Sequence, residues 1–189
     1  LKKNINNKLF EQKIKELKKL PKLIKTTLSV ESDIENISNT FANAKGSMFL
    51  GRGFAYPIAM EGALKLKELC YVHAEGYPAG EMKHGPLALI EEGIPVVVLA
   101  PRDKYYEKTL SNMQEVISRG AKVLLISNKS KDEISSENVW KTIEVEKTSD
   151  ELLPFLLTLP LQILAFHSAK NKGYDIDKPR NLAKSVTVE

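Results

Sequence analysis

The sequence predicts an α/β protein with a doubly wound, mostly parallel sheet that is flanked by helices. Short apolar runs that read as strands occupy residues 47–51, 94–100, 122–127 and 142–146. Continuous apolar runs are typical of parallel strands that are buried on both faces. Helical patterns alternate with these runs, and this alternation favours an open, doubly wound sheet.

The helices are predicted from apolar residues that recur at helical spacing. They cover about residues 56–71, 85–91 and 105–119, and a longer apolar helix covers about 150–171. In a doubly wound sheet, ligands bind beyond the carboxyl ends of the strands. The loop after the first strand, "GRGFAYP", is therefore the first place where we expect a ligand.

The pattern of apolar residues in 1–45 predicts a helical arm or linker that packs on the main domain. Pro21 interrupts a first amphipathic segment, and residues 31–44 form another. We expect the main domain at 46–172 and a turn-rich tail at 173–189.

Charge and composition are those of an ordinary globular protein. Lys and Arg number 28 against 24 Asp and Glu, and much of the excess lies near the N-terminus. No aromatic residues interleave these lysines for base stacking, so a solvated helix face is favoured over nucleic-acid binding. No apolar run approaches the roughly 18 residues of a membrane span, so we expect no membrane association.

The single cysteine, Cys70, excludes a disulfide within the chain and fits a reducing, cytoplasmic location. Its neighbours in "ELCYV" are apolar, which favours a packed thiol over a nucleophile.

Gly51, Arg52 and Gly53 follow the first predicted strand. Two glycines allow a tight turn and a close approach of the backbone to an anion at the next helix. An ordinary strand-to-helix turn explains the same residues equally well.

Glu61, Lys65 and Glu68 share one face of the next predicted helix. Spacing alone favours a solvated salt-bridge stripe. The alternative is a general base, held beside a lysine at the first strand's carboxyl end.

His84 precedes Gly85 and Pro86, and Pro86 is well placed to begin a helix. A histidine in this position is either a proton shuttle or an incidental loop residue. His73 and His167 have no comparable setting, and His167, in an apolar helix, is predicted to be structural. The histidines lack metal-ligand spacing, so we expect no metal and no cofactor.

The chain ends in "RNLAKSVTVE", which contains Ala183 and Lys184. Basic tails are usually poorly ordered. The apolar residues of "LAKSVTV", however, need cover if the tail is ordered.

Three motifs taken together, "EGALKLKE", "GEMKHGP" and "PRNLAKSVTVE", closely resemble the C-terminal part of the glutamine–fructose-6-phosphate aminotransferases, or glucosamine-6-phosphate synthases. The resemblance is to the second of their two sugar isomerase (SIS) domains. In that family, a glutaminase domain releases ammonia, and the SIS domains aminate fructose 6-phosphate and isomerise the product to glucosamine 6-phosphate.

The resemblance implies roles for individual residues. Glu68 is implied to be the base that moves a proton between sugar C1 and C2. Lys184 is implied to form a Schiff base with the open-chain ketose. His84 is implied to assist ring opening from a neighbouring subunit, and Lys65 to be a partner of Glu68. The resemblance also implies supporting or substrate-binding roles for Gly51, Arg52, Gly53 and Ala183.

The same resemblance implies a homodimer that works with the first SIS domain and the glutaminase domain. In the family, the first SIS domain holds a Ser- and Thr-rich loop that grips the sugar phosphate, whereas "GRGFAYP" has neither residue. We therefore expect this chain alone to be inactive. A non-catalytic sugar-phosphate-binding regulatory module and an interaction module remain as alternatives.

Overall fold

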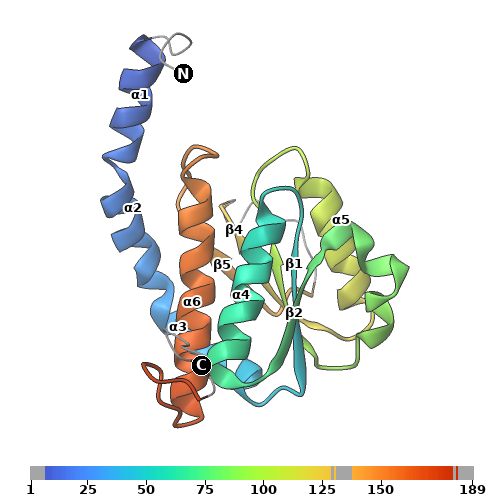
Figure 1. The fold of residues 1–189 in the computed structure, drawn as a ribbon. Coiled ribbons are helices and arrows are strands. Elements are labelled where there is room, and N and C mark those ends of the chain that lie inside the picture. Colours follow the sequence, from blue (N-terminus) through green and yellow to red (C-terminus); the bar gives the residue numbers. More distant parts are fainter. Residues whose placement is uncertain (1–6, 129, 131–137, 181, 183–189) are drawn as a thin grey trace, which may run out of the picture.

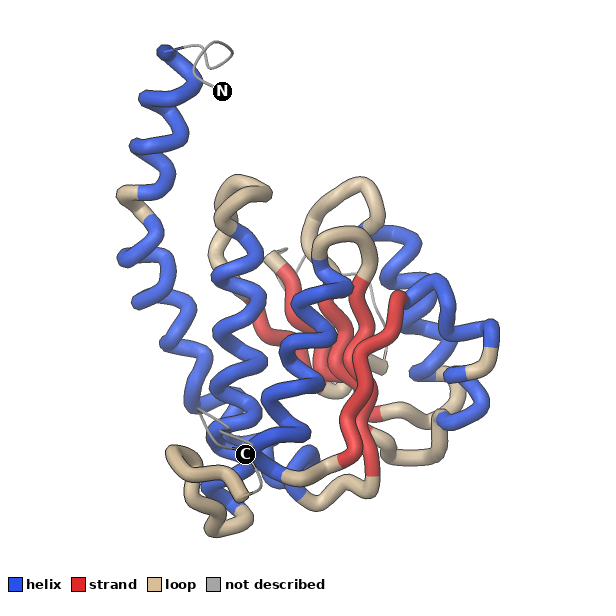
Figure 2. The backbone as a smooth tube through the Cα atoms, in the orientation of Figure 1, coloured by secondary structure: helices blue, strands red, loops and turns tan. Residues whose placement is uncertain are grey.

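A single five-stranded sheet, with all neighbouring strands parallel, forms the centre of the molecule (Figure 1 and Figure 2). This computed structural model describes residues 7–128, 130, 138–180 and 182. In the spatial order β2-β1-β3-β4-β5, the strands are β2 (His73–Pro78), β1 (Gly46–Gly51), β3 (Pro95–Leu99), β4 (Lys122–Ser127) and β5 (Lys141–Glu144). The predicted fold class is confirmed.

Helices cover both faces of the sheet. One face carries α3 (Glu31–Ala42), α4 (Ala55–Cys70) and α6 (Leu153–Asn171), and the other carries α5 (Tyr106–Ile117) with the short 3-10 helices η2 (Ala79–His84) and η3 (Pro86–Leu89). Each layer has its own buried cluster of apolar side chains. Phe41, Phe49 and Leu157 belong to the first cluster, and Met82 and Met113 belong to the second. Burial of this apolar surface is the main force that holds the layers together.

An arm of two helices, α1 (Asn7–Leu17) and α2 (Leu20–Thr27), precedes the short η1 (Leu28–Val30) and runs beside α6 (Figure 1). Pro21 lies in the first turn of α2, where its missing N–H costs no helical hydrogen bond. The Nζ of Lys13 lies 2.7 Å from a carboxylate oxygen of Glu151, which links α1 to the approach of α6.

Two secondary-structure elements, the strand β2 and the helix near residue 86, differ from the sequence prediction. The strand β2 was not predicted, because "HAEGYP" contains no apolar run: only Ala74 is fully buried on this outermost strand. The helix expected over about 85–91 is present only as the short 3-10 helix η3, Pro86–Leu89. Gly85, with φ +143°, separates η2 from η3, because that backbone conformation cannot occur inside a helix.

The parallel strands give the sheet two distinct ends. The amino end is where the strands begin, and the carboxyl end is where they finish. None of the described helices is long and apolar enough to cross a bilayer.

Candidate active site

Glu68 lies near the amino end of the sheet, on the last turn of α4. The helix begins at Ala55, just after β1 finishes, and returns the chain antiparallel to that strand. At 1.5 Å per residue, Glu68 is about 20 Å along the helix axis from its start. The expectation that the first strand's carboxyl end holds this carboxylate was therefore wrong.

Lys65 holds the Glu68 carboxylate in place. Its Nζ lies 2.6 Å from Oε2 of Glu68 and 3.8 Å from Oε1 of Glu61. The hydrogen bond to Glu68 raises the pKa of Lys65 above its ordinary value, so this lysine stays charged. The side chains of Lys65 and Glu68 are 30% and 28% exposed, so this carboxylate is fixed in position yet open to a substrate.

The chain that follows α6 is attached beside Glu68 by Tyr71. Gly173, with φ +67°, ends α6. The backbone N–H of Arg180 donates to the Tyr71 hydroxyl at 2.8 Å, and the Arg180 guanidinium carbon lies 4.0 Å from the centre of the Tyr71 ring. The Tyr174 ring lies against the same tyrosine, with centroids 4.9 Å apart. The start of the tail is thereby fixed at the end of α4.

Ala183 and Lys184 lie outside the described residues.

His84 lies on the opposite face of the sheet, at the end of η2. Its Nδ1 is 2.7 Å from Oε2 of Glu81, and its side chain is 73% exposed. Pro86 begins η3, so the expected helix start at this position is present, although the helix has a single short turn. Within one chain, the structure does not bring His84 to Glu68.

Gly51, Arg52 and Gly53 lie at the carboxyl end of the sheet, away from Glu68. A side chain at Gly51 would overlap the backbone of Ala55. Gly53 has φ +58°, and a Cβ there would lie 2.8 Å from the Tyr105 ring. Both glycines are thus required by the turn itself.

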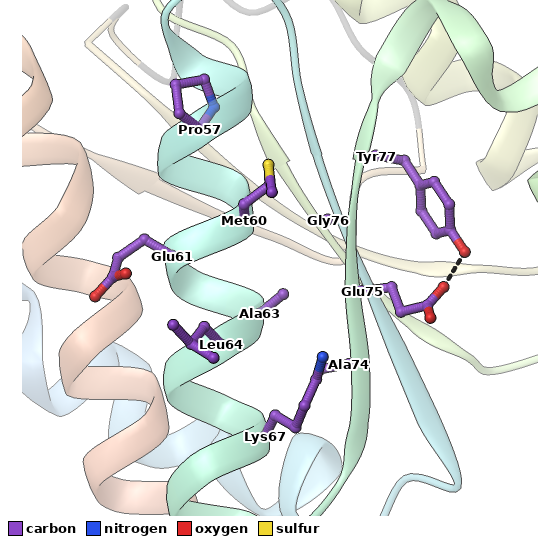
Figure 3. Close-up of a pocket in the computed structure, with 10 residues that line it drawn as sticks. All are labelled: Pro57, Met60, Glu61, Ala63, Leu64, Lys67, Ala74, Glu75, Gly76 and Tyr77. Carbon is purple, nitrogen blue, oxygen red and sulfur yellow. Dashed lines mark hydrogen bonds between the residues drawn. The ribbon is translucent and has the colours of Figure 1, made fainter.

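An open groove of about 600 Å³ runs between α4 and β2 (Figure 3). It is lined by Pro57, Met60, Glu61, Ala63, Leu64, Lys67, Ala74, Glu75, Gly76 and Tyr77. Gly76 lets the strand approach the helix, because a Cβ there would lie 2.7 Å from Cα of Met60. Met60 and Leu64 are 48% and 41% exposed, so the groove has an apolar wall.

The outer strand also carries a polar pair, Glu75 and Tyr77, that was missed from the sequence and whose side chains lie on the side of β2 away from α4. Figure 3 shows the hydroxyl of Tyr77 directed at the carboxylate of Glu75, to which it donates a hydrogen bond. This bond raises the pKa of Tyr77 to about 12, so the phenol keeps its proton. The alternation of polar residues in "HAEGYP" was the available signal.

Cys70 and His167 are structural, as the sequence predicted. The Cys70 thiol is buried and donates to the carbonyl of Ala165 at 3.3 Å, and burial raises its pKa to about 12. His167 is 3% exposed, with Nε2 3.0 Å from a carboxylate oxygen of Glu31. Across residues 7–128, 130, 138–180 and 182, no three His, Cys, Asp or Glu side chains gather in a way that could hold a metal ion.

Residues 40–171 match the SIS domain family. The chain belongs to that family. This SIS domain is 47% identical to a glutamine–fructose-6-phosphate aminotransferase (isomerizing) of Bartonella quintana, over 98% of the chain and 31% of the relative. It is 48% identical to the corresponding enzyme of Aquifex aeolicus, over 95% of the chain and 30% of the relative. It thus spans about a third of the length of these relatives.

A solved structure shows the same fold at high similarity. The C-terminal domain of the Francisella tularensis glucosamine-fructose-6-phosphate aminotransferase superposes with a TM-score of 0.87 at 42% identity. The match covers 92% of this SIS domain and 49% of that chain, so the solved domain is about twice as long.

The predicted residues of this SIS domain therefore fall in three places. Glu68 and Lys65 lie at the amino end of the sheet, where the tail is attached. Gly51, Arg52 and Gly53 lie at the carboxyl end. His84 lies on the opposite face.

Proposed function

We propose that this SIS domain is the part of a glutamine–fructose-6-phosphate aminotransferase that isomerises the aminated sugar to glucosamine 6-phosphate. The observation that carries the proposal is the position of the Glu68 carboxylate, whose Oε2 lies 2.6 Å from the Nζ of Lys65. It lies at the end of α4, where the hydrogen bond from Arg180 to Tyr71 attaches the tail. The identity to relatives with this printed name supports it.

The proposed chemistry is a proton transfer between neighbouring carbons. The Lys184 amine first forms a Schiff base at C2 of open-chain fructose 6-phosphate, with loss of water, and ammonia then displaces that amine to leave a C2 imine. Glu68 takes a proton from C1 while the imine nitrogen gains one, which gives an enol-amine. Return of the Glu68 proton to C2, with loss of the C1 hydroxyl proton, gives the aldose. One carboxylate that gives back the proton it takes is sufficient for this step.

Lys65 and Lys184 take different roles in this proposal. Lys65 stays protonated, because its hydrogen bond to Glu68 raises its pKa, and so it orients the base without exchanging protons itself. Lys184 engages the ketose C2 as a Schiff base before ammonia displaces it, which needs an amine that is neutral part of the time.

His84 enters the proposal from a second copy of the chain. Because the sheet separates His84 from Glu68 in one chain, we infer a homodimer in which the partner's copy of this histidine assists ring opening. The first SIS domain would grip the sugar phosphate, and the glutaminase domain would supply ammonia. A cytoplasmic location is part of the same proposal and is supported by the one buried thiol.

The first test is the interconversion of fructose 6-phosphate and glucose 6-phosphate by this chain, alone and mixed with the missing first SIS domain. We expect turnover only on mixing, with a rate about 10²–10⁴ lower for Glu68→Gln because the general base is lost. Glu61→Gln is the matched control, since Glu61 lies 3.8 Å from the same lysine. Turnover by this chain alone, or an unaffected Glu68→Gln rate, would contradict the proposal. Binding without turnover would favour the regulatory module.

A mixture of two inactive variants tests the shared site. In a homodimer, combining Glu68→Gln chains with His84→Gln chains, with the first SIS domain present, leaves half of the mixed dimers' sites intact, so about a quarter of the activity returns. No recovery would show that both residues act within one chain.

A further inference from the structure

The helix η2 presents its side chains in three rows, because residues three apart eclipse each other in a 3-10 helix. One row holds Ala79 and Met82, which are fully buried in the apolar cluster on this face of the sheet. Another holds Glu81 and His84, whose side chains are 61% and 73% exposed. The helix therefore has one row that anchors it and one row that faces solvent.

The remaining row fixes η2 to its neighbour on the same face of the sheet. The Nζ of Lys83 lies 2.8 Å from Oε1 of Glu115, which belongs to α5. Gly85, with φ +143°, then ends the helix directly after His84. Because burial and an ion pair both hold η2, its exposed row has a defined position before any substrate arrives.

The exposed row brings a carboxylate to one nitrogen of a histidine ring, and we call Glu81 and His84 the Glu–His pair. Oε2 of Glu81 lies 2.7 Å from Nδ1 of His84. An ionised carboxylate only accepts hydrogen bonds, so Nδ1 carries the proton of the neutral ring and Nε2 keeps its lone pair. Among the described residues, Nε2 has no partner. The pair therefore leaves one ring nitrogen free to accept a proton.

The buried histidine His167 has a different arrangement. Its Nε2 lies 3.0 Å from a carboxylate oxygen of Glu31, its Nδ1 lies 3.4 Å from one of Glu35, and its side chain is 3% exposed. Both of its ring nitrogens lie next to carboxylates and are closed to solvent, which suits a structural role. His84 has one carboxylate and one accessible nitrogen, which is the arrangement of a base that a third group orients.

We propose that Glu81 is a positioning residue for the opening of the sugar ring, because it holds His84 as the tautomer with the proton on Nδ1. The role rests on the proposed function, in which His84 assists that step. The free Nε2 takes the proton of the C2 hydroxyl of cyclic fructose 6-phosphate, and the C2 carbonyl forms as the bond from C2 to the ring oxygen breaks. Nε2 then gives its proton to that oxygen, so no proton is gained or lost. Glu81 stays ionised and stabilises the positive charge that the imidazole carries in between.

The other tautomer of the neutral ring does not suit this step. With the proton on Nε2, the accessible nitrogen could donate a hydrogen bond but could not take a proton from the sugar. The lone pair of Nδ1 would then face the carboxylate of Glu81, and two acceptors in contact repel each other. The Glu–His pair therefore selects the tautomer that ring opening needs.

The first test is the tautomer of His84 in the 189-residue chain, read from the nitrogen NMR signals of its ring at about pH 8.5, where an ordinary imidazole is neutral. We expect a protonated Nδ1 and an unprotonated Nε2 in the native chain, and a shift of the proton toward Nε2 in Glu81→Ala. A native ring with its proton on Nε2, or a tautomer that Glu81→Ala leaves unchanged, would overturn the proposal.

Lys83→Gln is the matched control, since it removes the charged partner of Glu115 from the same helix and leaves the Glu–His pair in place. This variant should keep the native tautomer. If it shifts the proton as much as Glu81→Ala does, the attachment of η2 to α5 sets the tautomer, and the proposal fails.

The second test compares two substrates in the mixture of this chain with the first SIS domain. Fructose 6-phosphate closes its ring through the C5 hydroxyl, so 5-deoxyfructose 6-phosphate stays an open chain. We expect Glu81→Ala to lower kcat for fructose 6-phosphate about 10–100-fold without a change in KM, because Glu81 orients His84 and does not touch the substrate. Turnover of the open-chain analogue should be unchanged, since it needs no ring opening.

Glu68→Gln is the comparison variant, because the base that it removes acts after ring opening and should be needed for both substrates. A loss of equal size for both substrates in Glu81→Ala, or no loss for either, would overturn the role of Glu81 alone. A native mixture that turns over neither substrate would overturn the proposed function, and this role with it.

Discussion

The cationic side chains at the two ends of the sheet have different partners. At the amino end, Lys65 lies between two carboxylates, and Arg180 is held by the hydroxyl and ring of Tyr71. At the carboxyl end, Arg52 and Lys104 share the ring of Tyr105, and no carboxylate among the described residues pairs with either cation. A paired lysine suits a carboxylate that must hold its position during proton transfer.

The largest effect should separate the two ends of β1 itself. Gly51→Ala, at the carboxyl end, forces a Cβ into the Ala55 backbone and should lower the free energy of unfolding by about 1–3 kcal/mol. Gly46→Ala, at the amino end, meets only the carbonyl of His73 at 3.4 Å and should change it by less than about 0.5 kcal/mol. Urea unfolding measures both. Equal losses would show that the turn at Gly51 is not tightly constrained.

An intermediate effect should come from Cys70, which is buried where α4 ends. Burial raises the pKa of its thiol to about 12, from an ordinary value of 9.0, so between these pH values the unfolded chain binds fewer protons than the folded chain. Stability that is fully present below pH 9 is therefore lost as the pH rises, by about 1 kcal/mol at pH 10. Urea unfolding at pH 8 and pH 10 should show this loss in the native chain and a smaller one in Cys70→Ala. The same pH dependence in both proteins would rule out this role for the thiol.

The most local effect, of a size similar to that of Cys70, should come from the tail attachment at the amino end. Tyr71→Phe keeps the ring under Arg180 but removes the hydroxyl that accepts its N–H, at a cost of about 1 kcal/mol. Trypsin cleavage after Arg180, followed by mass spectrometry, should accelerate about fivefold. Tyr174→Phe leaves that hydrogen bond in place and serves as the control. An unchanged cleavage rate in Tyr71→Phe would mean that the hydroxyl does not hold the tail.

The buried strands of the fold were predictable, and its outermost strand was not. β1, β3 and β4 are apolar on both faces, so their sequences stand out as continuous runs. β2 is covered incompletely, and its Gly76 and Pro78 argue against a strand when read alone. β2 is a strand because it pairs with β1, and the local sequence of β2 carries no information about that pairing.

The types of residue in the candidate site were predictable, but not their positions. Motif and spacing singled out Glu68, Lys65 and His84 from the sequence. The length of α4 then carries Glu68 to the amino end, and the sheet separates it from His84. The contact of Arg52 with Tyr105 could not be predicted, because it joins two loops far apart in sequence and leaves no periodic signal.

The outer side of β2 has a consequence for how copies of this chain meet. Within the described residues, β1 is the only strand that pairs with β2, so the outer side of β2 has no strand partner there, next to the groove of Figure 3. Such an exposed strand is a template on which another extended segment can add. At high protein concentration, a strand of another molecule can pair with this side and extend the sheet across molecules. The tendency of the protein to aggregate should therefore depend on whether that side is covered.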